Sequence, residues 1–365
     1  MPRVAIDKLK EGMVIAHDIR STKNQLLLVK DSVLTSQMIT QLACYGIDSA
    51  FVVEGDMPPA AKEKVMKFKE VDEVYIKKLL KTPQFQTFKK NYFSAADAVE
   101  VQFNDIVSRG SKLESEELLA GANRLFDENA STAYALLGML NALKMTDDST
   151  YSHCVNVAII ARMIGTWVKM SPKDLDNLTL GALLHDIGKC SVPEEIIKKS
   201  DKLLPREYEI IKMHTTYGYG ILRGQELDPD VIDVALHHHE RNDGSGYPHG
   251  LVGSGIGDFA AITAIADVYD AMTSPRIYRA AMCPFDVIAT YEREGLQKYD
   301  ARYITIFLRK IADSYINSEV MMNNGEVVRI INTNEHHLTR PMVQNSAGEI
   351  IKLEECPELY IEAIC

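Results

Sequence analysis

The feature that most constrains the fold is a series of histidines and aspartates on helix faces that are otherwise apolar. Between residues 149 and 315 the sequence reads as one helix after another, and five segments place an imidazole or a carboxylate on the apolar stripe. Ala182 and His185 share one such face, and Ala235 and His238 share another. An unpaired buried carboxylate costs several kcal/mol. The helices therefore have to bring these polar groups together.

Seven side chains form this series: His153, His185, Asp186, His214, His238, His239 and Asp267. Ligation to metal satisfies all of them at once, and mixed imidazole and carboxylate ligands suit Mn, Fe or another first-row ion. Seven ligands exceed the needs of one ion and predict two ions bridged by a carboxylate, an arrangement that promotes phosphoryl displacement. The alternative is a set of hydrogen-bonded core residues, which is the usual explanation of a lone inward histidine. His237 points about 100° away from His238 on an ideal helix, so of these histidines it is the one least expected to be a metal ligand.

The composition narrows the class of protein. The chain has 365 residues and a net charge of −11, so broad attraction to DNA, RNA or an anionic membrane is not expected. A local basic pocket for a small anion stays compatible with this charge. Six scattered cysteines make no disulfide framework, and no run of 18 apolar residues occurs. We expect a reduced, cytoplasmic protein without membrane insertion.

We expect a mainly α protein with four parts. Residues 1–57 form a small mixed α/β regulatory domain, with strands in "MVIAHDI" and "QLLLVK" and a helix in "TSQMITQLACYGI". Residues 58–148 are poor in glycine and form a helical connector that pairs two chains into a homodimer. Residues 149–317 form the helical bundle that carries the polar series. Residues 318–365 form a small β unit.

Local signals mark several element ends. Ser171-Pro172 and Asp228-Pro229 are typical of a helix N-cap followed by the first helical position. In the tail, Asn324-Gly325 predicts a hairpin turn, and "EVVRII", "EIIKL" and "HLTRPMV" predict strands, the last with Arg340-Pro341 at an edge.

Four segments, "HDIGK", "HTTYGYGIL", "HHERNDGSGYP" and "ADVYDAMTSPRIYR", stand in this order between residues 149 and 315. Together they resemble an HD-GYP domain, a subgroup of the metal-dependent HD phosphohydrolases. The sequences before and after this region resemble, more loosely, segments that flank the domain in bacterial regulators. The resemblance implies an HD-type helical bundle and hydrolysis of cyclic di-GMP to pGpG and then GMP.

The resemblance also implies roles for single residues. The seven side chains above become ligands of two divalent ions, Fe or Mn, with Asp186 as the bridge. Lys189 matches the motif lysine that contacts the scissile phosphate. Tyr247, Arg276 and Arg279 match residues that hold the dinucleotide. Diguanylate cyclase (GGDEF) proteins are implied as partners through the GYP loop.

The sequence departs from the family pattern at two positions. Some members carry a glutamate that ligates a third ion where this chain has Ser149, so we expect two ions. Pro275 stands where an aspartate is common. Three alternatives to a cyclic di-GMP phosphodiesterase stay open: an enzyme that prefers 3′,3′-cyclic GMP-AMP, a non-catalytic receiver of cyclic dinucleotides, and another HD hydrolase such as a nucleotidase. The GYP loop argues against the last.

Overall fold

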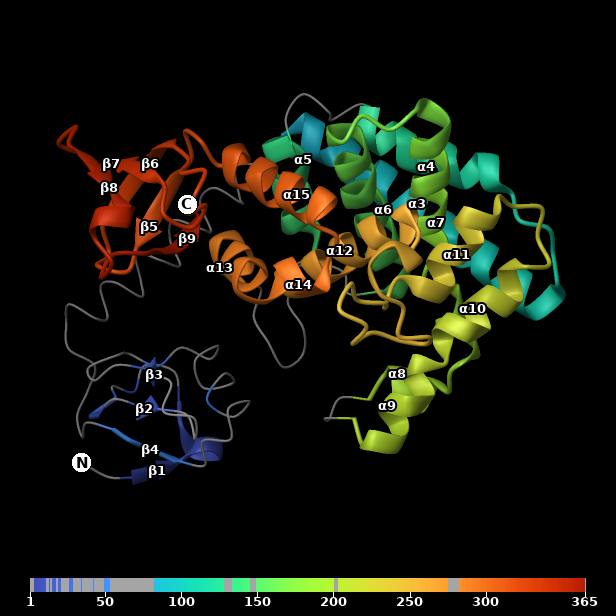
Figure 1. The fold of residues 1–365 in the computed structure, drawn as a ribbon, viewed down its shortest axis with the longest axis horizontal. Coiled ribbons are helices and arrows are strands. Elements are labelled where there is room, and N and C mark those ends of the chain that lie inside the picture. Colours follow the sequence, from blue (N-terminus) through green and yellow to red (C-terminus); the bar gives the residue numbers. More distant parts are fainter. Residues whose placement is uncertain are drawn as a thin grey trace. The chain divides into compact units, whose positions relative to one another are not determined.

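The structure is a computed structural model. It describes residues 3–10, 13, 15–17, 19–20, 26–28, 34, 42, 49–52, 82–127, 133–144, 149–199, 203–274 and 282–364. The chain divides into two compact units (Figure 1). One is formed by Met1–Ile76 with Pro275–Ala281 and Cys365, and the other by Lys77–Ser274 with Met282–Ile364.

The first unit contains two short antiparallel strand pairs. Strand β1 (Arg3–Ala5) pairs with β4 (Ser49–Phe51), and β2 (Ile19–Arg20) pairs with β3 (Leu26–Leu28). Its small apolar core consists of Leu9, Ile15, Ile19, Leu34, Leu42, Ala50 and Val52. The strands expected in "MVIAHDI" and "QLLLVK" are confirmed in part, as β2 and β3. Apart from Leu42, the expected helix in "TSQMITQLACYGI" lies outside the described residues.

The second unit is mainly helical, as expected. Its helices are α3 (Pro83–Arg109), α4 (Ser115–Asp127), α5 (Ala133–Lys144), α6 (Thr150–Trp167), α7 (Pro172–Leu184), α8 (Glu194–Ile197), α9 (Pro205–Lys212), α10 (His214–Leu222), α11 (Pro229–His237), α12 (Asp258–Thr273), α13 (Pro284–Thr290), α14 (Leu296–Lys298) and α15 (Ala301–Ser314). A 3-10 helix, η2 (Ile187–Ser191), follows α7. Within the described parts of the chain, no helix combines the length and the apolar character that crossing a bilayer requires.

The expected helix starts are confirmed. The Ser171 side chain accepts a hydrogen bond from the Asp174 N–H at the start of α7, and Asp228 accepts one from the Asp230 N–H at the start of α11. A proline follows each cap, where its missing N–H costs nothing. Ser149 caps α6 in the same way and accepts from the Ser152 N–H. These caps fix where the three helices begin.

Helices α3, α4 and α5 share one continuous apolar core with α6, α7 and α12. The Tyr92 hydroxyl on α3 is buried, 3.0 Å from the Ser152 carbonyl oxygen and 2.9 Å from Oδ1 of Asn156, both on α6. The first turns of α6 are therefore anchored to α3. The division of the chain into four parts, with a connector over residues 58–148, stays a prediction.

The C-terminal part of this unit is an antiparallel sheet in the order β8-β7-β6-β5-β9. Its strands are β5 (Glu319–Met322), β6 (Val327–Asn332), β7 (Met342–Gln344), β8 (Ile350–Lys352) and β9 (Ile361–Ile364). The hairpin at Asn324-Gly325 is confirmed, since Gly325 has a φ of 84° and its N–H donates to the Met322 carbonyl. The strand expected over "HLTRPMV" was wrong in its first half. Strand β7 begins only at Met342, because Pro341 has no N–H to donate to a neighbouring strand. The Arg340 guanidinium donates to the Cys356 carbonyl.

Candidate metal centre

All seven predicted ligands lie close together in the helical bundle, and they come from five segments. His153 is in the first turn of α6, His185 and Asp186 follow α7, His214 begins α10, His238 and His239 follow α11, and Asp267 is in α12. Three overlapping groups have ligand atoms within 4.8 Å of one another: His153, His185 and Asp267; His185, Asp186 and His238; and His214, His238 and His239.

A glycine allows two of these segments to approach closely. A Cβ atom on Gly188, in η2, would lie 1.9 Å from the His214 carbonyl oxygen and 2.5 Å from the Gly218 backbone nitrogen. No side chain fits there, so the glycine of "HDIGK" lets η2 lie directly against α10. This contact carries Asp186 toward His214.

Three of the imidazoles are oriented by the backbone. His185, His214 and His238 each direct Nδ1 at a carbonyl oxygen three or four residues earlier, over 2.7, 2.5 and 3.0 Å respectively. A hydrogen bond from Nδ1–H leaves the Nε2 lone pair free. Burial lowers the pKa of His214 and holds that of His238 well below its usual range, which favours the neutral rings.

The free nitrogens then face one another. Nε2 of His214 lies 3.3 Å from Nε2 of His238, so two lone pairs meet if both Nδ1 atoms carry the proton. Nε2 of His185 is buried and has no hydrogen-bond partner among the described residues. Such an arrangement is unfavourable unless a cation lies between the nitrogens.

Asp186 lies between the two sets of imidazoles. Its Oδ2 is 3.3 Å from Nε2 of His185 and 3.7 Å from Nε2 of His153. Its Oδ1 is 3.5 Å from Nε2 of His214 and 4.0 Å from Nε2 of His238. Oδ1 has no hydrogen-bond partner among the described residues. Each oxygen thus faces a different pair of rings, as expected of a carboxylate that bridges two ions.

Lys189, one turn after Asp186, compensates its charge. Nζ of Lys189 donates to Oδ2 of Asp186, which is 1% exposed. Burial alone would raise the pKa of Asp186, but Lys189 and then His185 outweigh it and hold the pKa well below its usual range. The carboxylate is therefore ionised. The Lys189 side chain is 28% exposed, so its ammonium group stays within reach of a ligand.

Sequence reasoning missed Asp270. Its Oδ2 lies 2.7 Å from Nδ1 of His153, while Nε2 of His153 lies 3.1 Å from Oδ1 of Asp267. Burial lowers the pKa of His153, but these two carboxylates outweigh it and raise the pKa to about 9. A carboxylate behind a ligating histidine fixes the ring and makes it more basic. The signal was the spacing, because Asp270 follows Asp267 by three residues on one helix face.

The "DGSGYP" loop lies against the same centre. The Tyr247 ring stacks on the His239 ring, with centroids 4.7 Å apart, and burial lowers the pKa of His239 to about 3. A Cβ on Gly246 would lie 2.4 Å from the backbone of Glu240 and of Arg241, so this glycine also permits a close approach. Tyr247 is thereby placed at the side of the metal centre.

The comparisons with known proteins agree with this geometry. A family model described as "HD domain" matches residues 116–303, which is more than half of the chain. The chain belongs to the HD domain family. It is 31% identical over 62% of its length to a cyclic di-GMP phosphodiesterase of Pseudomonas aeruginosa and 34% identical over 48% to a 3′3′-cGAMP-specific phosphodiesterase of Vibrio cholerae. It covers 55% and 41% of these two proteins, so it spans about half the length of its curated relatives.

Among solved structures, the chain is similar to an HDG"Y"P protein of Bdellovibrio bacteriovorus, and the match covers 84% of this chain and 97% of that protein. The sequence identity is 16% and the TM-score 0.49.

The donor set of this HD domain fits divalent metal. Imidazole nitrogens and ionised carboxylates converge on a buried centre, and two of their atoms, Nε2 of His185 and Oδ1 of Asp186, lack hydrogen-bond partners among the described residues. Of the predicted substrate-binding residues, the structure brings Lys189 and Tyr247 to this centre. Arg276 and Arg279 lie outside the described residues, as does Pro275.

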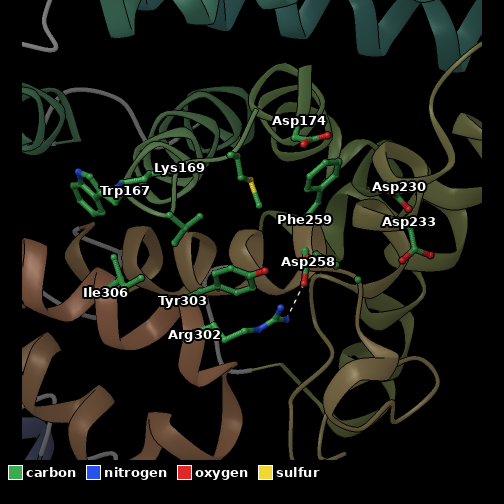
Figure 2. Close-up of a pocket in the computed structure, with 14 residues that line it drawn as sticks. Trp167, Lys169, Asp174, Asp230, Asp233, Asp258, Phe259, Arg302, Tyr303 and Ile306 are labelled. Carbon is green, nitrogen blue, oxygen red and sulfur yellow. Dashed lines mark hydrogen bonds and ion pairs between the residues drawn. The ribbon is translucent and has the colours of Figure 1, made fainter. Parts of the chain in front are cut away.

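A separate cavity of 690 Å³ opens elsewhere in the HD domain (Figure 2). It contains none of the seven predicted ligands. Three of its four carboxylates, Asp174, Asp230 and Asp258, stand in the first turns of α7, α11 and α12, where a negative charge interacts favourably with the helix dipole. Asp258 also pairs with Arg302 over 2.8 Å. We therefore assign these three carboxylates a structural role.

Proposed function

We propose that this protein is a metal-dependent phosphodiesterase that hydrolyses cyclic di-GMP to pGpG or GMP in bacterial second-messenger signalling. The observation that carries the proposal is the position of Asp186, each of whose oxygens faces a different pair of imidazoles. Paired metal sites of this kind promote in-line displacement at phosphorus. The names of the relatives support the substrate class.

In this proposal the chain's own residues hold and orient the substrate. Two divalent ions, Fe or Mn, would supply Lewis acidity and an activated water when bound. Lys189 is the cationic group beside Asp186, and its ammonium can donate to an oxygen of the scissile phosphate. Tyr247 offers a ring face next to His239. Arg276 and Arg279 would hold the phosphates through forked hydrogen bonds.

The proposed number of ions in this centre is two. Ser149 stands where a third-ion ligand would be, and its hydroxyl is already used as the N-cap of α6. A neutral hydroxyl is also a poor ligand for a divalent ion. Anomalous scattering at the metal edge should show two peaks among the seven ligands, and a third full peak there would contradict the assignment.

The alternative substrate is 3′,3′-cyclic GMP-AMP. The relative from Vibrio cholerae, 34% identical, is named as specific for this dinucleotide. No motif in the sequence reads base identity, so the sequence does not separate the two substrates. A second alternative is a non-catalytic receiver, which would bind the cyclic dinucleotide at the same place without hydrolysing it.

The deciding experiment is turnover of a panel of cyclic dinucleotides by the full chain, loaded separately with Mn and with Fe. We expect hydrolysis of cyclic di-GMP that chelation abolishes, with His336→Ala as a control because His336 is exposed in the C-terminal part. Faster hydrolysis of cyclic GMP-AMP would establish the alternative substrate. Tight binding without turnover in the metal-loaded protein would establish a receiver.

We also propose a homodimer formed through residues 58–148, GGDEF proteins as partners of the GYP loop, and a cytoplasmic location. We propose the dimer because this segment is long, charge-rich and poor in glycine, and has apolar residues at helical spacing. Light scattering across micromolar concentrations tests it, and a strictly monomeric mass would exclude the dimer.

A further inference from the structure

A second group of possible ligands lies beside the metal centre but shares no residue with it. It consists of His237, Glu240 and His249, whose ligand atoms lie within 4.8 Å of one another. Nε2 of His237 is 3.1 Å from Nδ1 of His249, and the ring centroids are 5.3 Å apart. His237 is the last residue of α11, and on an ideal helix it lies about 100° around the axis from its neighbour His238. The proposed function leaves this group without a role.

Asp233 supports His237 from behind. Its Oδ1 lies 2.9 Å from Nδ1 of His237, one turn earlier on α11. Figure 2 shows Asp233 next to Asp230 on this helix. The contact of Asp233 with His237 is an ion-pair contact and not a hydrogen bond, since Nδ1 of His237 has no hydrogen-bond partner among the described residues. The nearby carboxylate favours a positive charge at this ring, such as that of a bound cation.

Glu240 brings the loop back to the same place. It is 1% exposed, and its two oxygens accept the backbone N–H groups of His249, over 2.7 Å, and of Leu251, over 3.0 Å. Each carboxylate oxygen keeps a second lone pair. The bond to the His249 backbone fixes the position of that residue beside the carboxylate, while its exposed ring leaves a path for an ion from solvent.

We propose that His237, Glu240 and His249 bind a Zn²⁺ ion. Two imidazoles and one carboxylate form a ligand set that zinc accepts, with a fourth position left open. The simpler explanation is a hydrogen bond between the two rings, which would need no ion. The ion would join the end of α11 to the loop that carries Tyr247. It would thereby hold the two ends of this loop, near residues 240 and 249, close together. The site does not depend on the proposed phosphodiesterase activity.

The test is zinc content of the full chain after dialysis against buffered zinc. We expect His249→Ala and His237→Ala each to bind one equivalent less than the unmutated protein, and the double variant also to lose one equivalent rather than two. His336→Ala, which removes an exposed histidine elsewhere, should lose none. Because His249 is exposed, its replacement should not disturb folding, and His249→Gln serves as a second variant should His237→Ala fail to fold.

The same comparison in an Asp186→Ala background separates this site from the central one. His249→Ala should again remove one equivalent there, whatever number the central ligands retain. Zinc should also slow hydrogen exchange of the His249 and Leu251 amides in the unmutated protein and not in His249→Gln. Equal zinc content with and without His249, or an equal loss in His336→Ala, would overturn the proposal.

Discussion

Asp186 occupies a costly position, since it is an almost completely buried carboxylate with one oxygen that has no hydrogen-bond partner in the described structure. Its charge is compensated by Lys189 on one side and is surrounded by imidazole nitrogens on the other. Folding tolerates a buried charge only when nearby groups offset its desolvation. Here the partly exposed Lys189 does so while leaving the inner oxygen available for metal.

Replacing this carboxylate should therefore affect both metal binding and stability. We expect Asp186→Ala and Asp186→Asn to lose hydrolysis and at least one metal equivalent. The metal-free variants should also be destabilised by about 1–3 kcal/mol, because the partly exposed Lys189 loses the carboxylate that accepts its hydrogen bond. Metal analysis with urea unfolding measures both effects. Full activity in a folded variant would contradict the site assignment.

Asp270 acts on the centre through His153. We expect Asp270→Asn to weaken metal affinity roughly 10–100-fold, because the ring loses the carboxylate that orients Nε2. A competition titration with a chelator measures the affinity. Asp230→Asn is the matched control, since Asp230 is an exposed helical carboxylate outside the centre. Equal affinities in the two variants would leave Asp270 without a positioning role.

At the scale of elements, the centre depends on how closely two short segments approach. The side of η2 at Gly188 lies against α10, and the loop at Gly246 lies against the backbone after α11. In both places a hydrogen atom occupies the space that a methyl group would need. The first contact brings His214 toward Asp186, and the second brings the loop that carries Tyr247 toward His239.

A methyl group at Gly188 should separate η2 from α10. We expect Gly188→Ala to be destabilised by about 1–3 kcal/mol or more and to lose metal, because a Cβ atom would lie 1.9 Å from the His214 carbonyl oxygen. Gly220→Ala, on α10, is the matched control because nothing lies within 4 Å of its added Cβ. It should be stabilised by about 0.5–1 kcal/mol. Thermal unfolding and metal content decide, and similar behaviour of the two variants would argue against the close-approach explanation.

At the scale of the whole second unit, the helices before residue 149 belong to the core that holds the centre. Helix α3 contributes Phe85, Phe88 and Phe103 to the same apolar cluster as α6 and α12. The buried Tyr92 hydroxyl adds a polar contact to the first turns of α6, where His153 lies. Changes in α3 are therefore expected to reach the centre through α6.

We expect Tyr92→Phe to lower stability by about 1–2 kcal/mol, because the substitution leaves the Ser152 carbonyl and the Asn156 side chain without this hydroxyl. Metal affinity should fall by a smaller factor than in Asp270→Asn. Tyr208→Phe is the control, since Tyr208 is 49% exposed on α9. Unfolding curves and chelator titrations of the two variants give both quantities. A Tyr92→Phe protein as stable as the control would show that this contact does not anchor α6.

The sequence alone determined the helical class, the starts of α7 and α11, the hairpin at Asn324-Gly325 and the seven polar residues that come together. Each rests on local chemistry: a cap beside a proline, a turn dipeptide, or a polar side chain on an apolar stripe. Only the tertiary structure decided that the two oxygens of Asp186 face different rings, that Asp270 supports His153, and that Glu240 holds the loop beside His237. These depend on how segments far apart in the chain approach one another, and helical periodicity indicates the face on which a residue lies but not its partner across the bundle.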